Sequence, residues 1–67
     1  MSVAKIIEIN ATSPTSFDDA IRQGIAKASK TIDSIRGAWV KDQQVIVEAG
    51  AIKEYRVDLK LTFILHE

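Results

Sequence analysis

The chain has 67 residues, with nine Lys plus Arg, nine Asp plus Glu, one His and no Cys. A domain this small buries only about 60% of its surface when it folds alone, and the missing Cys exclude a disulfide framework or a thiolate metal site. The balanced, evenly spread charge disfavours nucleic-acid binding, so we expect a single domain, residues 1–67, that gains stability by self-association.

The beginning of the chain predicts a strand rather than a targeting segment. Residues Met1 to Lys5 lack the positive region and apolar run of a signal peptide, and no stretch approaches about 18 consecutive apolar residues. The run Val3–Asn10 is rich in β-branched residues and ends at the small and polar residues Ala11–Pro14, as expected of a first strand. We therefore expect a soluble, cytoplasmic protein with no membrane role.

A helix is predicted next. Ser16, with Asp19 three residues later, has the spacing of a capping box and predicts that the helix begins at Phe17. Apolar side chains then recur at three- and four-residue spacing as far as Ile32. This pattern predicts one buried stripe on a helix of about eighteen residues that frays near Ser34.

The second half of the chain is typical of a β-hairpin. Two runs rich in β-branched and aromatic residues, Gly37–Glu48 and Lys53–Leu65, are joined across Ala49–Ala51. From Tyr55 onward apolar and polar residues alternate, so one face of this strand is expected to meet a core. The first run is apolar on both faces, which predicts either cover on both sides or a bulge that exchanges the faces.

These elements predict an α+β fold with β-α-β-β order, in which a three-stranded antiparallel sheet is wrapped around one helix. One helix covers only one side of such a sheet. The apolar residues expected to lack cover are Ala38, Val40, Ile46 and Ile64. A second exposed apolar surface of this kind predicts a subunit interface.

The sequence offers no catalytic constellation. There is no Cys, and the single His66 is next to the end of the chain, where we expect it to be solvated. Ser, His and acidic residues occur in no arrangement typical of a triad, and the three glycines lie too far apart to cradle a phosphate. We expect a protein that is not an enzyme.

Three kinds of binding residue stand out, each with a structural alternative. Trp39 offers a flat ring for stacking on a planar ligand, or it packs against the helix or a neighbouring subunit. Gln43 supplies amide donors and acceptors, or it belongs to an exposed strand. Asp42 and other carboxylates suit calcium or magnesium where subunits meet, or they form cross-strand pairs such as Asp42 with Arg56.

Several segments together resemble the dodecins in order and spacing. They are Thr12–Ala20, Ala26–Thr31, Ile35–Gly37 and Glu54–Val57. The resemblance covers nearly the whole chain, and it implies β-α-β-β subunits that assemble as hollow homododecamers. It also implies flavin binding for storage or protection rather than catalysis.

The positions that recognise flavin in this family differ here. Gly37 stands where flavin-binding members have a stacking Trp, and Trp39 lies two residues later. Arg56 stands where some members have a Gln that bonds the flavin ring. A two-residue shift moves a side chain by about 6.6 Å along a strand, so Trp39 would require another ligand pose. Some similar members are associated with calcium, and Asp42 matches a cation position in certain relatives.

The sequence therefore predicts a non-enzymatic homododecamer that binds or stores FMN or riboflavin. Trp39 would stack on the ring, Gln43 would make an amide contact and Arg56 would contact a phosphate or a ring oxygen. One alternative is a calcium- or magnesium-binding assembly that uses Asp42. The other is a purely structural shell in which Trp39 packs at an interface.

Overall fold

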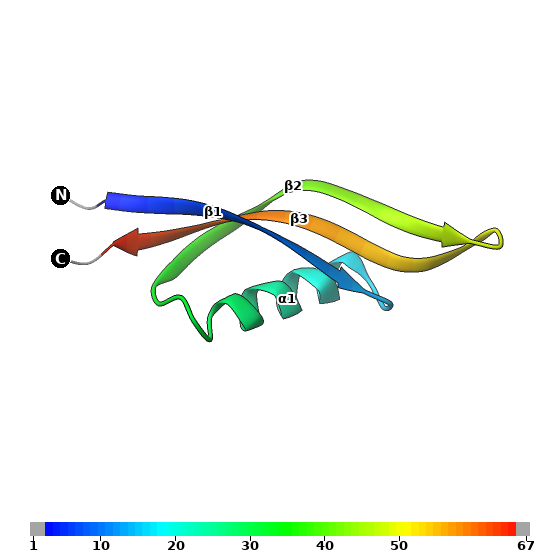
Figure 1. The fold of residues 1–67 in the computed structure, drawn as a ribbon, viewed down its shortest axis with the longest axis horizontal. Coiled ribbons are helices and arrows are strands. Elements are labelled where there is room, and N and C mark those ends of the chain that lie inside the picture. The colour runs from blue at the N-terminus through cyan, green and yellow to red at the C-terminus, as the bar shows by residue number, and fades with distance from the viewer. Residues whose placement is uncertain (1–2, 66–67) are drawn as a thin grey trace.

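The computed structural model describes residues 3–65, so His66 lies outside the described residues. The elements, in chain order, are β1 (Val3–Ser13), α1 (Phe17–Ala28), β2 (Ile35–Glu48) and β3 (Ala51–Leu65). The strands form one antiparallel sheet in the order β1-β3-β2, and α1 lies on one face of it (Figure 1). The predicted β-α-β-β order and fold class are confirmed. We call the face of the sheet away from α1 the outer face.

The helix is shorter than predicted. It ends at Ala28 rather than near Ser34, because its last turn tightens: the Lys30 and Thr31 N–H groups donate to carbonyls three residues back, both at 3.2 Å. Ser34 then adopts a left-handed backbone with φ of 62°, and its carbonyl accepts a bond from the Ile64 N–H at 3.2 Å. The apolar period therefore continues past the end of the helix itself.

The start of the helix is capped as predicted. Ser16 Oγ accepts a hydrogen bond from the Asp19 N–H at 3.0 Å. The Asp19 carboxylate accepts instead from Ser13 Oγ at 2.5 Å and from Gln23 Nε2 at 2.6 Å. Ser13 is buried at the end of β1, which extends to this residue rather than to Asn10, so the helix cap is tied to the sheet.

The core lies between α1 and the centre of the sheet. Ala20, Val57, Leu59 and Leu61 are fully buried there. The alternating apolar face predicted for the last strand supplies three of these four residues. Gly24 permits the close approach of α1, because a Cβ built on it would lie 3.1 Å from the Ala11 Cβ.

A β-bulge exchanges the faces of β2, as one of the two sequence interpretations required. Val40 pairs with Leu59 and Asp42 pairs with Asp58, so Lys41 is an extra residue. Further register shifts follow Ile35 and Ile46 in the same strand pair.

The Asp42–Arg56 pair considered from the sequence is not formed across the strands. Arg56 lies opposite Gln44, while Asp42 lies opposite Asp58. Two register shifts cause this difference. One lies between Ile35 and Gly37 and the other is the bulge at Lys41, and each displaces every later residue of β2 by one position relative to β3.

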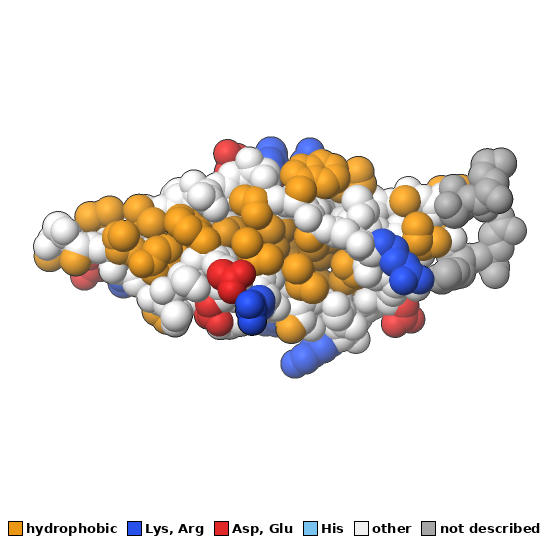
Figure 2. All heavy atoms as spheres, turned by 180° about the vertical axis from the view of Figure 1, so that it is seen from behind, with side chains coloured by type: hydrophobic (Ala, Val, Ile, Leu, Met, Phe, Trp, Pro, Cys, Tyr) orange, Lys and Arg blue, Asp and Glu red, His pale blue; other side chains and the backbone are white. Residues whose placement is uncertain are grey.

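The molecule is elongated. Its principal extents are 51 × 20 × 13 Å, and its radius of gyration is 13.8 Å, where a compact chain of this length has about 11 Å. The β2–β3 hairpin extends beyond α1 and beyond the end of β1 (Figure 1). Apolar side chains gather along this end, where Val47 is 60% and Ile52 is 52% exposed (Figure 2).

The apolar positions expected to lack cover are only partly covered. Ala38 and Val40 are exposed, whereas Ile46 and Ile64 are half-buried. Among residues 3–65, no helix is both long and apolar enough to cross a membrane.

Candidate ligand site on the outer face

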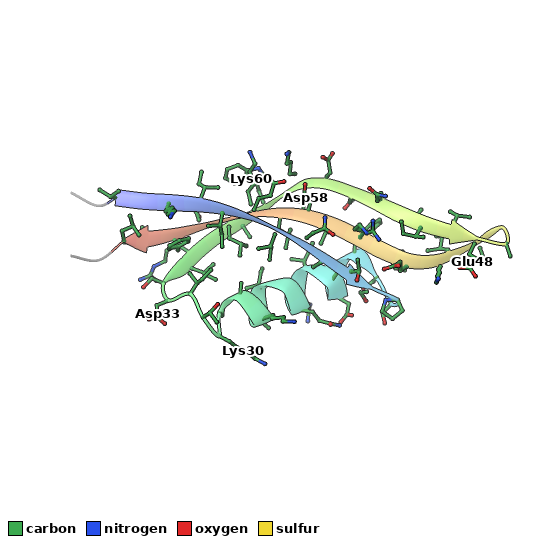
Figure 3. All side chains as sticks on the ribbon, viewed as in Figure 1. Lys30, Asp33, Glu48, Asp58 and Lys60 are labelled. Carbon is green, nitrogen blue, oxygen red and sulfur yellow. The ribbon has the colours of Figure 1, made fainter. Side chains whose placement is uncertain are left out.

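Trp39 lies on the outer face beside Lys60, its partner on β3. The Lys60 Nζ atom is 5.7 Å from the centre of the Trp39 ring, and Trp39 is 48% exposed. Figure 3 shows Lys60 and Asp58 on the side of the sheet away from α1. The indole is therefore neither buried by its own subunit nor free of neighbours, because an ammonium group covers part of it.

A hollow of about 190 Å³ opens next to this pair. Its walls are formed by Asn10, Asp42, Gln43, Gln44, Arg56 and Asp58. The strand register accounts for the arrangement, since Asn10, Asp58 and Asp42 form one row across the three strands. The structure thus brings three sequence-predicted residues, Asp42, Gln43 and Arg56, to one hollow, whereas Trp39 lies outside its walls.

The bulge decides which amide shares a face with Trp39. By simple alternation along the sequence, Trp39 and Gln43 fall on one face of the strand. Because Lys41 is an extra residue, Gln43 instead pairs with Val57, whose side chain is buried under α1. Gln44 pairs with Arg56 on the outer face. Gln43 reaches the wall of the hollow, but Gln44 is the glutamine on Trp39's face.

Three carboxyl groups approach one another around Asp58. Burial raises the pKa of Asp58, and the hydrogen bond to Glu8 raises it further. The same hydrogen bond lowers the pKa of Glu8, although desolvation opposes this, and Lys41 also lowers it. The Lys41 Nζ is 3.4 Å from the Glu8 Oε2. The hydrogen bond between the two carboxyl groups therefore acts on their pKa values in opposite directions, and it favours a shared proton on Asp58 rather than on Glu8.

Glu8 is the residue of this group that sequence reasoning missed. It is the only acidic residue of β1, and nothing near it in the sequence indicates that it meets other carboxyl groups. Only the β1–β3 register, which pairs Glu8 with Lys60 and Asn10 with Asp58, brings it near the other carboxyls.

Arg56 lines the hollow and also carries a buried polar atom. Among the described residues, its Nε is a buried nitrogen without a hydrogen-bond partner. A buried donor left unpaired costs about 1–3 kcal/mol, so the Arg56 side chain is held in this position at a cost to stability.

Two other features of the described residues bear on ligand binding. A groove of about 630 Å³ between α1 and β1 is larger than this hollow, and its lining combines apolar residues such as Ile9 and Ala28 with polar residues such as Gln23. It contains none of the binding residues predicted from the sequence. Among residues 3–65, no three acidic or His side chains converge closely enough to hold a metal ion.

Comparisons with known proteins agree on one family. The calcium dodecin of Mycobacterium tuberculosis is 38% identical over 63 residues, which is 94% of this chain and 89% of that protein. A solved structure of T. thermophilus dodecin, in a variant with one arginine replaced by alanine, matches with a TM-score of 0.94 and 31% identity, covering 100% of both chains.

A second solved structure is that of calcium dodecin from Mycobacterium tuberculosis, a calcium-chelating antigen with a novel calcium-binding site. It matches with a TM-score of 0.83 and 38% identity, covering 97% of this chain and 93% of that chain. The family model for dodecin matches residues 3–66, nearly the entire sequence. The chain therefore belongs to the dodecin family.

Proposed function

We propose that this dodecin is a non-enzymatic homododecamer that binds and stores a flavin, FMN or riboflavin, on the outer face of its sheet. The observation that carries the proposal is the half-exposed indole of Trp39 beside a polar hollow that Arg56 lines. Membership of a family that binds flavins supports it.

The size of the hollow indicates how a flavin would lie. Its volume of about 190 Å³ is smaller than the roughly 300 Å³ at which ligand pockets begin, so it would admit only the polar edge of the ring system. The rest of the ring would stack on Trp39, while Arg56 or the Gln43 amide meets a ring oxygen or phosphate. A second copy would cover the other face of the ring.

Excess surface supports the oligomer. The protomer exposes 4860 Å², whereas a compact monomer of this mass exposes about 4,200 Å². The hairpin beyond the Ser13–Tyr55 pair is two-stranded, and an isolated two-stranded hairpin is marginally stable in water. Contacts with other copies would cover the exposed Val47 and Ile52 side chains there.

Flavin fluorescence tests the proposal. Micromolar protein should quench FMN or riboflavin, and Trp39→Ala should abolish the quenching by removing the stacking surface. Ile6→Ala is the matched control, because Ile6 is similarly exposed at 52% on the outer face. Unquenched flavin with the wild-type assembly would refute flavin binding, and sedimentation of the same samples would report the oligomer separately.

Cation binding is the second candidate, and it is favoured by the position of two acidic residues and by the name of a relative. Two carboxylates, Asp42 and Asp58, face each other across the strands, and a relative 38% identical is named calcium dodecin. Calcium or magnesium would bind where Asp42 groups of two copies meet, since oxygen ligands suit both ions. Calorimetry should then show calcium binding that Asp42→Asn removes and Glu54→Gln retains; equal binding by both variants would exclude Asp42 as a ligand.

A further inference from the structure

Lys60 occupies the centre of a row of three side chains across the outer face. It pairs with Glu8 on β1 and with Trp39 on β2, so its neighbours are a carboxylate on one side and an indole on the other. Its Nζ atom lies 5.7 Å from the centre of the indole ring rather than in an ion pair with Glu8. Lys60 therefore places its positive charge where a ring would stack.

The carboxylate beside Lys60 already has partners. Glu8 is bonded to Lys41, with 3.4 Å between Nζ and Oε2, and it is hydrogen-bonded to Asp58. An ammonium displaced from the Trp39 ring by a stacked ligand would find this carboxylate engaged. It would gain most from a negative charge that the ligand itself brings.

We propose that Lys60 is a specificity-determining residue that makes the Trp39 surface select planar ligands carrying an anionic group. The inference rests on the proposed flavin function and names the ligand class within it, which is FMN rather than riboflavin. A neutral ring displaces the ammonium and loses its contact with the indole. A phosphorylated ring displaces it equally but pairs the ammonium with the phosphate.

The charges around the row agree with this assignment. Lys41 adds a second positive group beside Glu8, and Arg56 lies four residues from Lys60 on β3, about 13 Å along the strand. Arg56 therefore serves the far end of a stacked ring, while Lys60 serves the end near Trp39.

Affinities for the two flavins test the proposal. Wild-type protein at low salt should bind FMN at least tenfold more tightly than riboflavin. Lys60→Met keeps the aliphatic stem but removes the charge, so it should weaken FMN binding by about tenfold and leave riboflavin binding equal or tighter. Lys60→Arg should retain the preference, and added salt should reduce it.

The matched control is Lys53→Met, because Lys53 is on the same strand but is paired with Glu48 at 2.9 Å near the hairpin end. It should leave both affinities unchanged.

An unaltered FMN-to-riboflavin affinity ratio in Lys60→Met, or an equal loss of FMN affinity in Lys53→Met, would overturn the role of Lys60 while leaving flavin binding intact. If wild-type protein binds neither flavin, the proposed function and this inference both fail. If Lys60→Met does not assemble, the ratio is measured in Lys60→Arg, where a lost preference would count against the inference.

Discussion

Asp42 and Asp58 lie directly opposite each other on neighbouring strands, although like charges in such positions repel. Desolvation and the hydrogen bond to Glu8 raise the pKa of Asp58, and the negative charge of Asp42 raises it further. The pKa values of these carboxyl groups therefore depend on the folded sheet, and the free energy of unfolding should depend on pH.

The pH dependence has a definite sign. Because folding raises the pKa of Asp58, its contribution to stability is present below the ordinary aspartate pKa and is lost as pH rises through the raised value. Folding lowers the pKa of Glu8, so its contribution is present above the ordinary glutamate pKa and is lost as pH falls through the lowered value. The pair should thus stabilise the fold most at mildly acidic pH.

Asp58→Asn removes the part of this dependence that belongs to Asp58. An amide cannot ionise, yet it still donates a hydrogen bond to Glu8, so the variant should be more stable than wild type at neutral pH and should lose less stability as pH rises, while the loss through Glu8 at low pH remains. Urea unfolding at a series of pH values measures both effects. Parallel profiles for the two proteins would contradict the shared proton.

The hairpin turn carries strain at a non-glycine residue. Ala49 and Gly50 have φ values of 52° and 77°, the left-handed conformation of a two-residue turn. Ala49→Asn should raise the free energy of unfolding by about 0.5–1 kcal/mol, because Asn tolerates this conformation better than Ala. Gly50→Ala should lower it by about 1 kcal/mol, and chemical denaturation distinguishes the two. If both substitutions changed the free energy of unfolding in the same direction and by the same amount, the left-handed backbone of the turn would not explain their effects.

The contact between α1 and β1 at Gly24 leaves little room for a side chain. Gly24→Ala gains about 1 kcal/mol of helix propensity but presses on Ala11, so we expect stability within about 1 kcal/mol of wild type. Gly24→Val should lose about 1–3 kcal/mol by overpacking. Thermal unfolding followed by circular dichroism tests the ranking, and a stable Val variant would mean that the helix can shift.

The cap of α1 should be worth about 1 kcal/mol. Ser16→Ala removes the acceptor for the Asp19 N–H, whereas Ser16→Asn preserves it. Denaturant unfolding should therefore show a loss of about 1 kcal/mol for the Ala variant and little change for the Asn variant. Matching losses in the two variants would indicate that the hydroxyl has another role.

The sequence predicted those features that depend on local pattern. Strict alternation from Tyr55 onward identified the core face of β3, and Ser16 identified the start of α1. It placed the end of α1 too late, because Ile32 keeps the apolar period although the backbone hydrogen bonds change after Ala28. A one-dimensional pattern records side-chain polarity but not the tightened last turn that ends the helix.

The candidate site was predictable only in part, because it depends on register between distant segments. The residues Asp42 and Arg56 were identified by type, yet their placement required the bulge at Lys41. Glu8 joins Asp58 only through the β1–β3 pairing. Neither relation has a signature in neighbouring residues.

The hairpin that extends past α1 also affects how the protein should be studied. Val47 and Ile52 do not pack into the core of their own protomer, so substitutions there should change the association equilibrium rather than the stability of the protomer. For an obligate assembly, the melting temperature rises with protein concentration. If the chain forms the proposed homododecamer, dilution should therefore unfold it as heat or urea does.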